Sequence, residues 1–360
     1  MDVAGVQSRA MPEAAPSHER LLALVDQLAG QPVLMLVDLV ADRFVTGTPK
    51  RISREAPVLI LRHEEEEVLP GGGANAAANV AALGGRPLPV GIVGADASGD
   101  DLLAAFVARG IPTDGILRRP GYRTPTKVRI LAGARHSIKQ QVVRYDVEGE
   151  LTLADADRVF LADQLRRLAG ASRVAVLSDY GYGAVDPSFV AGARAVVGSD
   201  GTVLCDSRYR LSEFAGIDGA TPNEEEAEAM LGRRLGDGAG LLESGTQLRE
   251  RLGARFVLVT RGSLGMALFS DGGCAEVPVH GTDQVADVTG AGDTVIGTFA
   301  LAIAAGATPL EAALLANYAG GVVVMKRGTA TLTPGELRAA VQRDRHLPST
   351  VRWEGSPSDG

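Results

Sequence analysis

The feature that most constrains the fold is a repeated alternation of short, continuous apolar runs with helical segments. The run PVLMLVD is followed by the helical segment ANAAANVAALGG, and PLPVGIVGAD is followed by GDDLLAAFVARG. Later runs are RVAVLSDY, GTVLCDS, RFVLVTRG and GMALFSD, with the helical segment ATPNEEEAEAML between them. Continuous apolar runs of this length are typical of strands buried on both faces. The pattern therefore predicts an α/β protein, with a mostly parallel central sheet covered by helices on both faces.

Two segments interrupt this alternation. RFVTGTPKRISREAPVLILRHEEEE and YRTPTKVRILAGARHSIKQQVVRYD alternate polar and β-branched residues and lack helical periodicity. They predict a small antiparallel sheet from residues 43–68 and 121–147, outside the main sheet. We interpret Glu64–Glu67 as its solvated edge rather than a metal site. The remaining boundaries are a disordered tail over 1–18, one domain over 19–345 and a C-terminal tail over 346–360.

The composition restricts the function classes. A net charge of -8 and a pI of about 5.3 disfavour a nucleic-acid partner. Cys205 and Cys274 lack C-x-x-C spacing, so we expect no disulfide framework or zinc site, and a reducing cytoplasm fits. We expect no signal peptide, because no apolar segment follows the first residues. We expect no membrane span, because Gly306, Pro309 and Glu311 interrupt the most apolar stretch.

The segment DVTGAGDTVIG places a glycine turn at the start of a predicted helix. Gly290 and Gly292 leave the backbone amides near them unshielded, and the positive end of the helix dipole favours an anion there, usually phosphate. Asp293 then has two interpretations. It caps the helix, or it acts as a general base for a hydroxyl that attacks a phosphoryl group. This segment alone leaves both open.

Two other segments have the residue types of a nucleotide site. Asn223 and Glu226 lie one helical turn apart, and their oxygens suit Mg²⁺ or its waters, although an exposed acidic helix start has the same pattern. Gly262 and Gly265 follow the strand VLVT and allow a nucleotide to lie close to the backbone; a hairpin turn is the alternative.

The segment LPGGGANAAANVAALGG contains the second strong glycine turn. Gly71–Gly73 allow a ligand to approach the backbone, and Asn75 offers an amide at the helix start; a turn with an Asn cap is the alternative. With Ala76 and Asp96 it also loosely matches a dinucleotide fingerprint, but Pro70 and an acidic run precede it where a strand is required. The sequence contains neither a Walker motif nor a G-x-S-x-G elbow.

Together these segments resemble a known family. PGGGANAAANVAALGG and DVTGAGDTVIGTFA resemble the two signatures of the ribokinase-like (PfkB) sugar kinases, and TPNEEE is similar to their Asn-x-x-Glu element. The resemblance extends from about Pro32 to about Val341. KRISREAPV, YRTPTKVRI, LSDYGYG and LANYAGGVVVMKRGTATLT are most similar to kinases that phosphorylate O1 of D-glycero-D-manno-heptose 7-phosphate with ATP. The chain departs from them at Val37, where they have Gly, and at Asp206–Arg208, where they have Asp-Pro-Lys.

The resemblance implies a sugar kinase that uses ATP and Mg²⁺, with Asp293 as the base. It implies an anion hole at Gly290, Ala291 and Gly292; Mg²⁺ and phosphate contacts at Asn223 and Glu226; nucleotide contacts at Thr260, Gly262, Gly265 and Asn317; and sugar contacts at Asp42, Gly71, Gly72 and Asn75. The two inserted segments would form a lid over the sugar, and a homodimer through it is expected.

A phosphorylated sugar requires basic residues on the lid side of the site. Arg51, Lys127 and Arg129 are the candidates, although Lys and Arg also protect the edges of solvated strands. Kinase action on another sugar, a sugar phosphate or a nucleoside stays open. A Rossmann-type NAD oxidoreductase and a non-catalytic sugar-binding protein are the alternatives of another class.

Overall fold

A ten-stranded sheet forms the centre of the computed structural model, which describes residues 15–134, 139–281 and 286–355. The strand order is β14-β13-β12-β11-β10-β9-β8-β1-β4-β5. Neighbours from β11 to β5 are parallel, and β12, β13 and β14 extend the sheet in antiparallel fashion. The bounds are β1 (Pro32–Val37), β4 (Arg86–Gly94), β5 (Ile116–Arg119), β8 (Val174–Asp179), β9 (Thr202–Ser207), β10 (Gly219–Ala220), β11 (Phe256–Thr260), β12 (Met266–Ser270), β13 (Gly273–Val277) and β14 (Arg352–Gly355).

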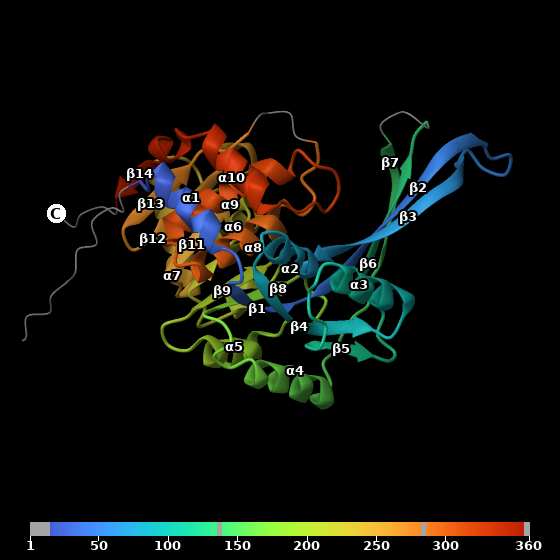
Figure 1. Ribbon diagram of the computed structural model, residues 1–360, viewed down its shortest axis with the longest axis horizontal. Helices are drawn as coiled ribbons and strands as arrows, with labels where there is room; N and C mark the ends of the chain where they lie inside the picture. The colour runs from blue at the N-terminus through green and yellow to red at the C-terminus, as the bar shows by residue number, and fades with distance from the viewer. Residues whose placement is uncertain (1–14, 135–138, 282–285, 356–360) are drawn as a thin grey trace, which may run out of the picture.

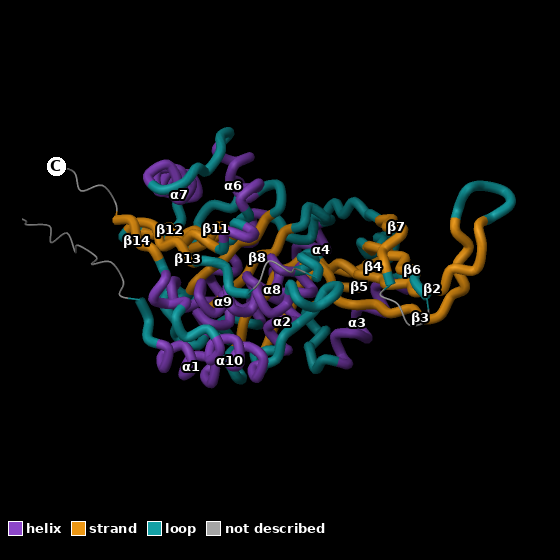
Figure 2. The backbone as a smooth tube through the Cα atoms, turned by 90° about the horizontal axis from the view of Figure 1, so that it is seen from above, coloured by secondary structure: helices purple, strands orange, loops and turns teal. Residues whose placement is uncertain are grey.

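Helices cover both faces of this sheet, as the sequence pattern predicts. Figure 2 shows α1, α9 and α10 on one side of the strands and α6 and α7 on the other. The bounds are α1 (His18–Gln27), α2 (Gly73–Ala82), α3 (Ala97–Ala108), α4 (Asp155–Arg167), α5 (Val190–Val197), α6 (Glu224–Leu231), α7 (Ala239–Leu252), α8 (Ala291–Ala304), α9 (Pro309–Val323) and α10 (Pro334–Arg343). Similarity to solved structures, reported below, confirms the fold class.

The central strand β1 explains why the apolar runs are continuous. Val33 and Met35 belong to the core formed with α1, α2, α8 and α9, whereas Leu34 and Leu36 belong to the core formed with α4, α5 and α7. All four side chains are buried. Because successive side chains of a strand point to opposite faces, a strand between two helical layers must be apolar at every position.

A second sheet of four strands, the lid, projects from the body (Figure 1). Its order is β3-β2-β6-β7, with bounds β2 (Leu39–Ile52), β3 (Leu59–Gly72), β6 (Thr126–Ala132) and β7 (Gln140–Val147). The hairpins β2–β3 and β6–β7 are antiparallel, as predicted, but β2 and β6 pair in parallel. The first hairpin is also longer than predicted. It starts directly after β1 and ends in the glycine turn at Gly72, so the lid is joined to the body at the glycine-rich segment.

The chain ends differ from the predicted tails. Helix α1 begins at His18, within the segment predicted as a tail, whose residues 1–14 lie outside the described residues. At the other end Arg352–Gly355 forms β14, which pairs with β13. A four-residue strand is too short to show a readable alternation, which is why the sequence indicated only a tail there. In the described part of the chain, no helix has the length and hydropathy needed to cross a membrane.

Candidate active site

Two adjoining cavities lie where the strands of the main sheet end and the lid begins. The first has a volume of about 450 Å³ and the second about 520 Å³, and Thr260, Val288 and Gly292 line both. The ends of β8, β9 and β11 contribute Asp179, Asp206 and Thr260. Ligands of open α/β sheets bind beyond the carboxyl ends of the strands, so this is the expected location for a site.

Asp293 is a buried residue of the first cavity, in the first turn of α8. Its side chain does not cap the helix, because the N-cap position is Gly290 and no side chain accepts a capping hydrogen bond there. Instead, the Tyr180 hydroxyl donates to Oδ1 at 2.5 Å, and the Asn75 amide donates to Oδ2 at 3.0 Å. Burial raises the pKa of Asp293 to about 6, although both donors lower it. The carboxylate is therefore suited to accept a proton near neutral pH.

The start of α8 presents free backbone amides beside Asp293. The Ala291 amide donates to the Val288 carbonyl at 3.2 Å, so it is only partly available. In the described part of the chain, the amides of Gly290 and Gly292 have no hydrogen-bond partner. Gly290 has φ +76°, and a Cβ on it would lie 2.5 Å from the Asn75 amide nitrogen. The turn therefore requires glycine at 290 and forms a cradle for an anion.

The glycine turn before α2 makes room for neighbouring side chains. A Cβ on Gly71 would lie 2.9 Å from the carboxyl carbon of Asp42. Gly72 has φ +53°, and a Cβ there would lie 3.3 Å from the Tyr180 ring. Gly72, Asp42 and Asp293 line the first cavity. Asn75 does not line it, but its amide donates a hydrogen bond to Asp293. The structure thus joins the two glycine turns through the Asn75–Asp293 hydrogen bond.

The base of the lid contributes a cluster of charged side chains to the first cavity. In the lid register Asp42 lies opposite Lys127, and Arg129 lies opposite Arg144. Arg129 forms an ion pair with Asp42 at 3.5 Å, too long for a direct hydrogen bond. Asp42 Oδ1 and Arg129 Nε are buried and have no hydrogen-bond partner in the part of the chain that is described. Buried polar atoms of this kind normally have a partner, so the cluster fits a polar ligand.

Arg51, the third basic candidate, is not brought to this cluster. It lies near the far end of β2, exposed, and does not line the cavity. Two other cations that the sequence analysis did not select, Arg144 and Arg208, do line it. Arg208 belongs to the segment Asp206–Arg208, where the chain departs from the heptose kinases that it resembles. That departure is the one sequence feature that could have indicated Arg208 as a site residue. Nothing in the local sequence of Arg144 distinguishes it from other lid residues.

The predicted metal residues form a capping box at the start of α6. Asn223 Oδ1 accepts from the Glu226 amide at 2.8 Å, and Glu226 Oε2 accepts from the Asn223 amide at 2.9 Å. Both side chains line the first cavity, and so does Asp206, whose pKa burial and the Glu226 carboxylate raise well above its usual range. The described residues contain no cluster of three or more His, Cys, Asp or Glu side chains suited to hold a metal.

This donor set fits Mg²⁺ bound through few protein oxygens. Mg²⁺ usually keeps several waters and is held by one or two carboxylates together with substrate phosphates. Glu226 and Asp206 supply two carboxylates on one side of the first cavity, and the amide cradle of α8 lies in the same cavity. Asn223 could contribute only its Oδ1 to Mg²⁺ or its waters, and this oxygen already accepts from the Glu226 amide.

The second cavity has a size and a lining that suit a nucleotide. The predicted nucleotide contacts Thr260, Gly262, Gly265 and Asn317 all line this one cavity. Gly262 and Gly265 have φ +54° and +88°, values that favour glycine, and they bring the backbone to the cavity wall. The wall also contains apolar side chains that suit the face of a planar base, namely Met266, Val279, Val295 and Val324, together with the polar Ser263 and His280. The Asn317 side-chain amide donates to the Pro278 carbonyl at 2.8 Å, which fixes its orientation.

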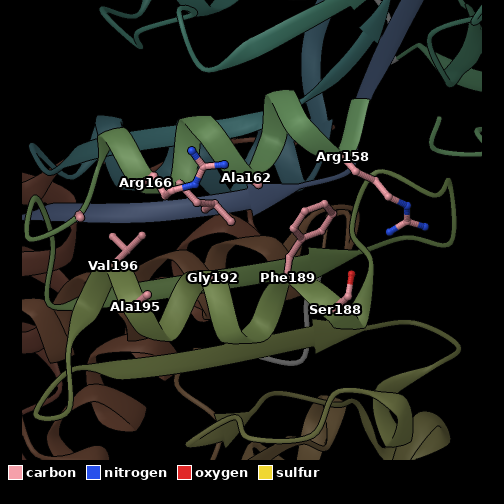
Figure 3. A pocket seen from close by; sticks show the side chains of 10 residues that line it. Arg158, Ala162, Arg166, Ser188, Phe189, Gly192, Ala195 and Val196 are labelled. Atoms are coloured by element: carbon pink, nitrogen blue, oxygen red, sulfur yellow. The ribbon is translucent and has the colours of Figure 1, made fainter. Parts of the chain in front are cut away.

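A separate cavity of about 360 Å³ lies between α4 and α5 and contains none of the candidate residues (Figure 3). Its two cations are already paired: Arg158 with Asp186 at 3.3 Å and Arg166 with Asp163 at 2.5 Å. The rest of its lining is mainly small or apolar. It therefore lacks the features of an active site.

The dinucleotide alternative finds no support at Asp96. Its carboxylate accepts from the Gly99 amide at 2.8 Å and from the Thr124 amide at 2.9 Å. It is the N-cap of α3, so its oxygens are used to hold local structure rather than directed to a ribose.

Comparisons with known proteins show which sequences and structures this chain is similar to. Residues 33–335 match the pfkB family of carbohydrate kinases. The chain is 37% identical to the bifunctional protein HldE of Mesorhizobium japonicum over 336 residues, 93% of this chain and 66% of that protein. It is 42% identical to the bifunctional protein HldE of Pseudomonas aeruginosa, over 87% of this chain and 64% of that protein. The chain thus spans slightly less than two thirds of the length of these relatives.

Solved structures show the same fold. Phosphofructokinase-2 from Escherichia coli, in complex with substrates and products, has a TM-score of 0.69 at 19% identity, over 87% of this chain and 99% of that chain. Ribokinase from Arabidopsis thaliana, complexed with ribose and ATP, has a TM-score of 0.67 at 22% identity, over 87% and 99%.

Proposed function

This chain belongs to the pfkB family of carbohydrate kinases, and from that premise we propose that it transfers the γ-phosphoryl group of ATP to a hydroxyl of a phosphorylated sugar. The best acceptor is O1 of D-glycero-D-manno-heptose 7-phosphate, giving the 1,7-bisphosphate. The observation that carries the proposal is the buried Asp293 carboxylate, which lies in the first cavity beside the amide cradle of α8, where the second cavity adjoins at Gly292.

The residues divide the work of the reaction. The second cavity binds the nucleotide, with its base against the apolar wall near Asn317. In the first cavity Asp293 takes the proton of the attacking sugar hydroxyl. A bond forms between that oxygen and the γ-phosphorus, the bond from phosphorus to the ADP oxygen breaks, and ADP leaves with that electron pair. The free amides of Gly290 and Gly292 stabilise the negative charge on the phosphoryl oxygens.

Mg²⁺, when bound, neutralises negative charge on the nucleotide phosphates. Glu226, Asp206 and Asn223 are the residues that would hold it or its waters. Asp42 accepts hydrogen bonds from sugar hydroxyls, because its Oδ1 is a buried acceptor without a hydrogen-bond partner among the described residues.

The substrate phosphate is assigned to the cations of the first cavity. Lys127, Arg129 and Arg144 lie on neighbouring lid strands, and Arg208 lies on the body side of the same cavity. Asp42 forms an ion pair with Arg129, and Asp146 forms one with Arg144. Guanidinium groups bind phosphate oxygens two at a time, so a dianionic group at the end remote from the reacting hydroxyl suits this cluster.

The proposal is tested by incubating the protein with ATP, Mg²⁺ and a panel of acceptors: heptose 7-phosphate, fructose 6-phosphate, ribose and a nucleoside. The phosphorylated position is then found by phosphorus and carbon NMR. We expect turnover with the heptose phosphate and a new phosphate ester at O1. Turnover only with unphosphorylated acceptors would refute the assignment of the phosphate, and NAD(H) conversion without ADP release would refute the reaction.

We also propose that two copies associate through the lid. Val58, Leu59, Val142 and Val143 are exposed apolar residues on the lid, and they line a shallow cavity there together with Val45. Val45 points away from the face that presents Asp42, because residues an odd number apart lie on opposite faces of a strand. An exposed apolar sheet face of this kind is typical of an interaction surface, and a second copy would cover it with the same residues.

Light scattering after gel filtration tests the dimer. Val143→Glu, which places a charge in the apolar face, should convert a dimer to a monomer. Val107→Glu is the matched control, because Val107 is also exposed but lies on α3. A monomeric wild-type protein, or a Val143→Glu variant that stays dimeric, would contradict the proposal.

A further inference from the structure

The Tyr180 hydroxyl donates the shorter of the two hydrogen bonds to Asp293. The sugar and nucleotide contacts assigned above give Tyr180 no role. We propose that Tyr180 is a positioning residue for the reaction: with Asn75 it fixes the rotation of the Asp293 carboxylate and keeps that group ionised for proton transfer. The inference rests on the proposed function and adds a residue to it. Three observations support it.

The first observation is that the backbone of Tyr180 is held by a second buried carboxylate. Asp38, which is 1% exposed, accepts from the amides of Tyr180, Tyr182 and Ala184 at 2.8, 3.0 and 3.0 Å. Three bonds to one carboxylate fix the loop that follows β8. The phenol is therefore attached to a rigid point, unlike a side chain on a free loop.

The second observation is that the ring has little space to rotate. It packs against Gly72, where a Cβ would lie 3.3 Å from the ring carbons, and the Lys127 ammonium lies 5.4 Å from the ring centroid. On the other oxygen, the amide of Asn75 is oriented by Asn79, which donates to Asn75 Oδ1 at 3.2 Å. Both donors to Asp293 are thus fixed by neighbours of their own.

The third observation is that the two donors leave acceptor capacity on the carboxylate. Each carboxylate oxygen has about two acceptor sites, and Tyr180 and Asn75 occupy one each. A sugar hydroxyl can therefore approach Asp293 without displacing Tyr180. Burial raises the pKa of Tyr180 well above its usual value, so the phenol remains a neutral donor throughout the working pH range.

Other charges near Asp293 are independent of Tyr180. Asp42 on β2 raises the pKa of Asp293, and Lys127 on β6 lowers it. Asp206, at the end of β9, is a further carboxylate, and the charge of Asp293 raises its pKa. Arg208, in the same cavity, lowers the pKa of Tyr180 through its positive charge. All four remain in a Tyr180→Phe variant, which removes only the hydroxyl. Any change in the ionisation of Asp293 can then be assigned to the lost hydrogen bond.

The test is a carbon-13 NMR titration of aspartate carboxyl groups in the full chain, with Asp293→Asn used to assign the signal. Tyr180→Phe should raise the pKa of Asp293 by about one unit, because a hydrogen bond to a charged group is lost. Tyr182→Phe is the control: it removes a neighbouring phenol hydroxyl that does not touch Asp293, and it should leave that pKa unchanged.

Activity gives the second readout. The acid limb of kcat/KM should move to higher pH in Tyr180→Phe by the same amount, with most of the loss recovered at high pH. An unchanged pKa, or an equal loss of activity at every pH, would overturn the inference. If the wild-type protein phosphorylated no sugar at all, the proposed function would fail, whereas the NMR titration would still report on Tyr180.

Discussion

Gly292 offers a test of the amide cradle that separates ligand binding from folding. It is the second residue of α8, its φ is not positive, and a Cβ built on it meets no protein atom within 4 Å. The new methyl group of Gly292→Ala would point into space that both cavities share. The methyl group should therefore not disturb folding, but it should occupy space that the transferred phosphoryl group needs.

The expected magnitudes have opposite signs. Replacing glycine by alanine at a compatible position restricts the unfolded chain and favours the helix, which raises the free energy of unfolding by about 0.4–1 kcal/mol. A methyl group in the cradle displaces the phosphoryl group from the Gly290 and Gly292 amides. Loss of one such donor costs about 10²–10³ in kcat, so we expect kcat to fall by at least about tenfold.

Gly240 provides a matched control. It is the second residue of α7, it also follows an alanine and a glycine N-cap, and a Cβ on it meets no atom within 4 Å. Urea unfolding and ADP release would be measured for both variants. Gly240→Ala should gain stability and keep its activity. A Gly292→Ala variant with wild-type kcat, or one that is destabilised, would refute the reasoning about the cradle.

Three further predictions follow from the site. Glu226→Gln should raise the Mg²⁺ concentration needed for half-maximal activity, because one charged oxygen is lost; an unchanged titration would leave Glu226 only its capping role. Lys127→Ala should raise KM about tenfold for a phosphorylated sugar but not for its unphosphorylated analogue, with Arg51→Ala as a control outside the cavity; equal effects would place the phosphate elsewhere. Wild-type kcat/KM should rise with pH through about 6, where Asp293 becomes ionised, and a flat profile would exclude it as the titrating group.

The sequence indicated those parts of the site that depend on local chain geometry. A glycine turn before a helix leaves backbone amides unshielded wherever the helix lies in the fold. Gly290, Gly292 and Asp293 could therefore be selected from one segment. The same holds for Gly262 and Gly265 after a buried strand. In each case the conformation follows from a few consecutive residues, and the structure retains it.

Contacts between distant segments could not be predicted in this way. Tyr180 is 113 residues from Asp293, and Asp38 is 142 residues from Tyr180. In the sequence, Asp38 and Tyr180 are each the last residue of a predicted apolar strand. They contact each other because β1 and β8 are neighbours, which places both strand ends at one edge of the sheet. Arg144 likewise enters the cavity only through the register of β6 and β7.

Single-turnover phosphoryl transfer by Asp293→Asn tests the central claim most directly. The variant keeps an oxygen that can accept from Tyr180 but loses the group that takes the proton. The transfer rate from ATP to the sugar should fall by about 10²–10⁴, while ATP binding, measured separately by calorimetry, should be retained. A transfer rate close to that of the wild-type protein would contradict the role of Asp293 as the general base.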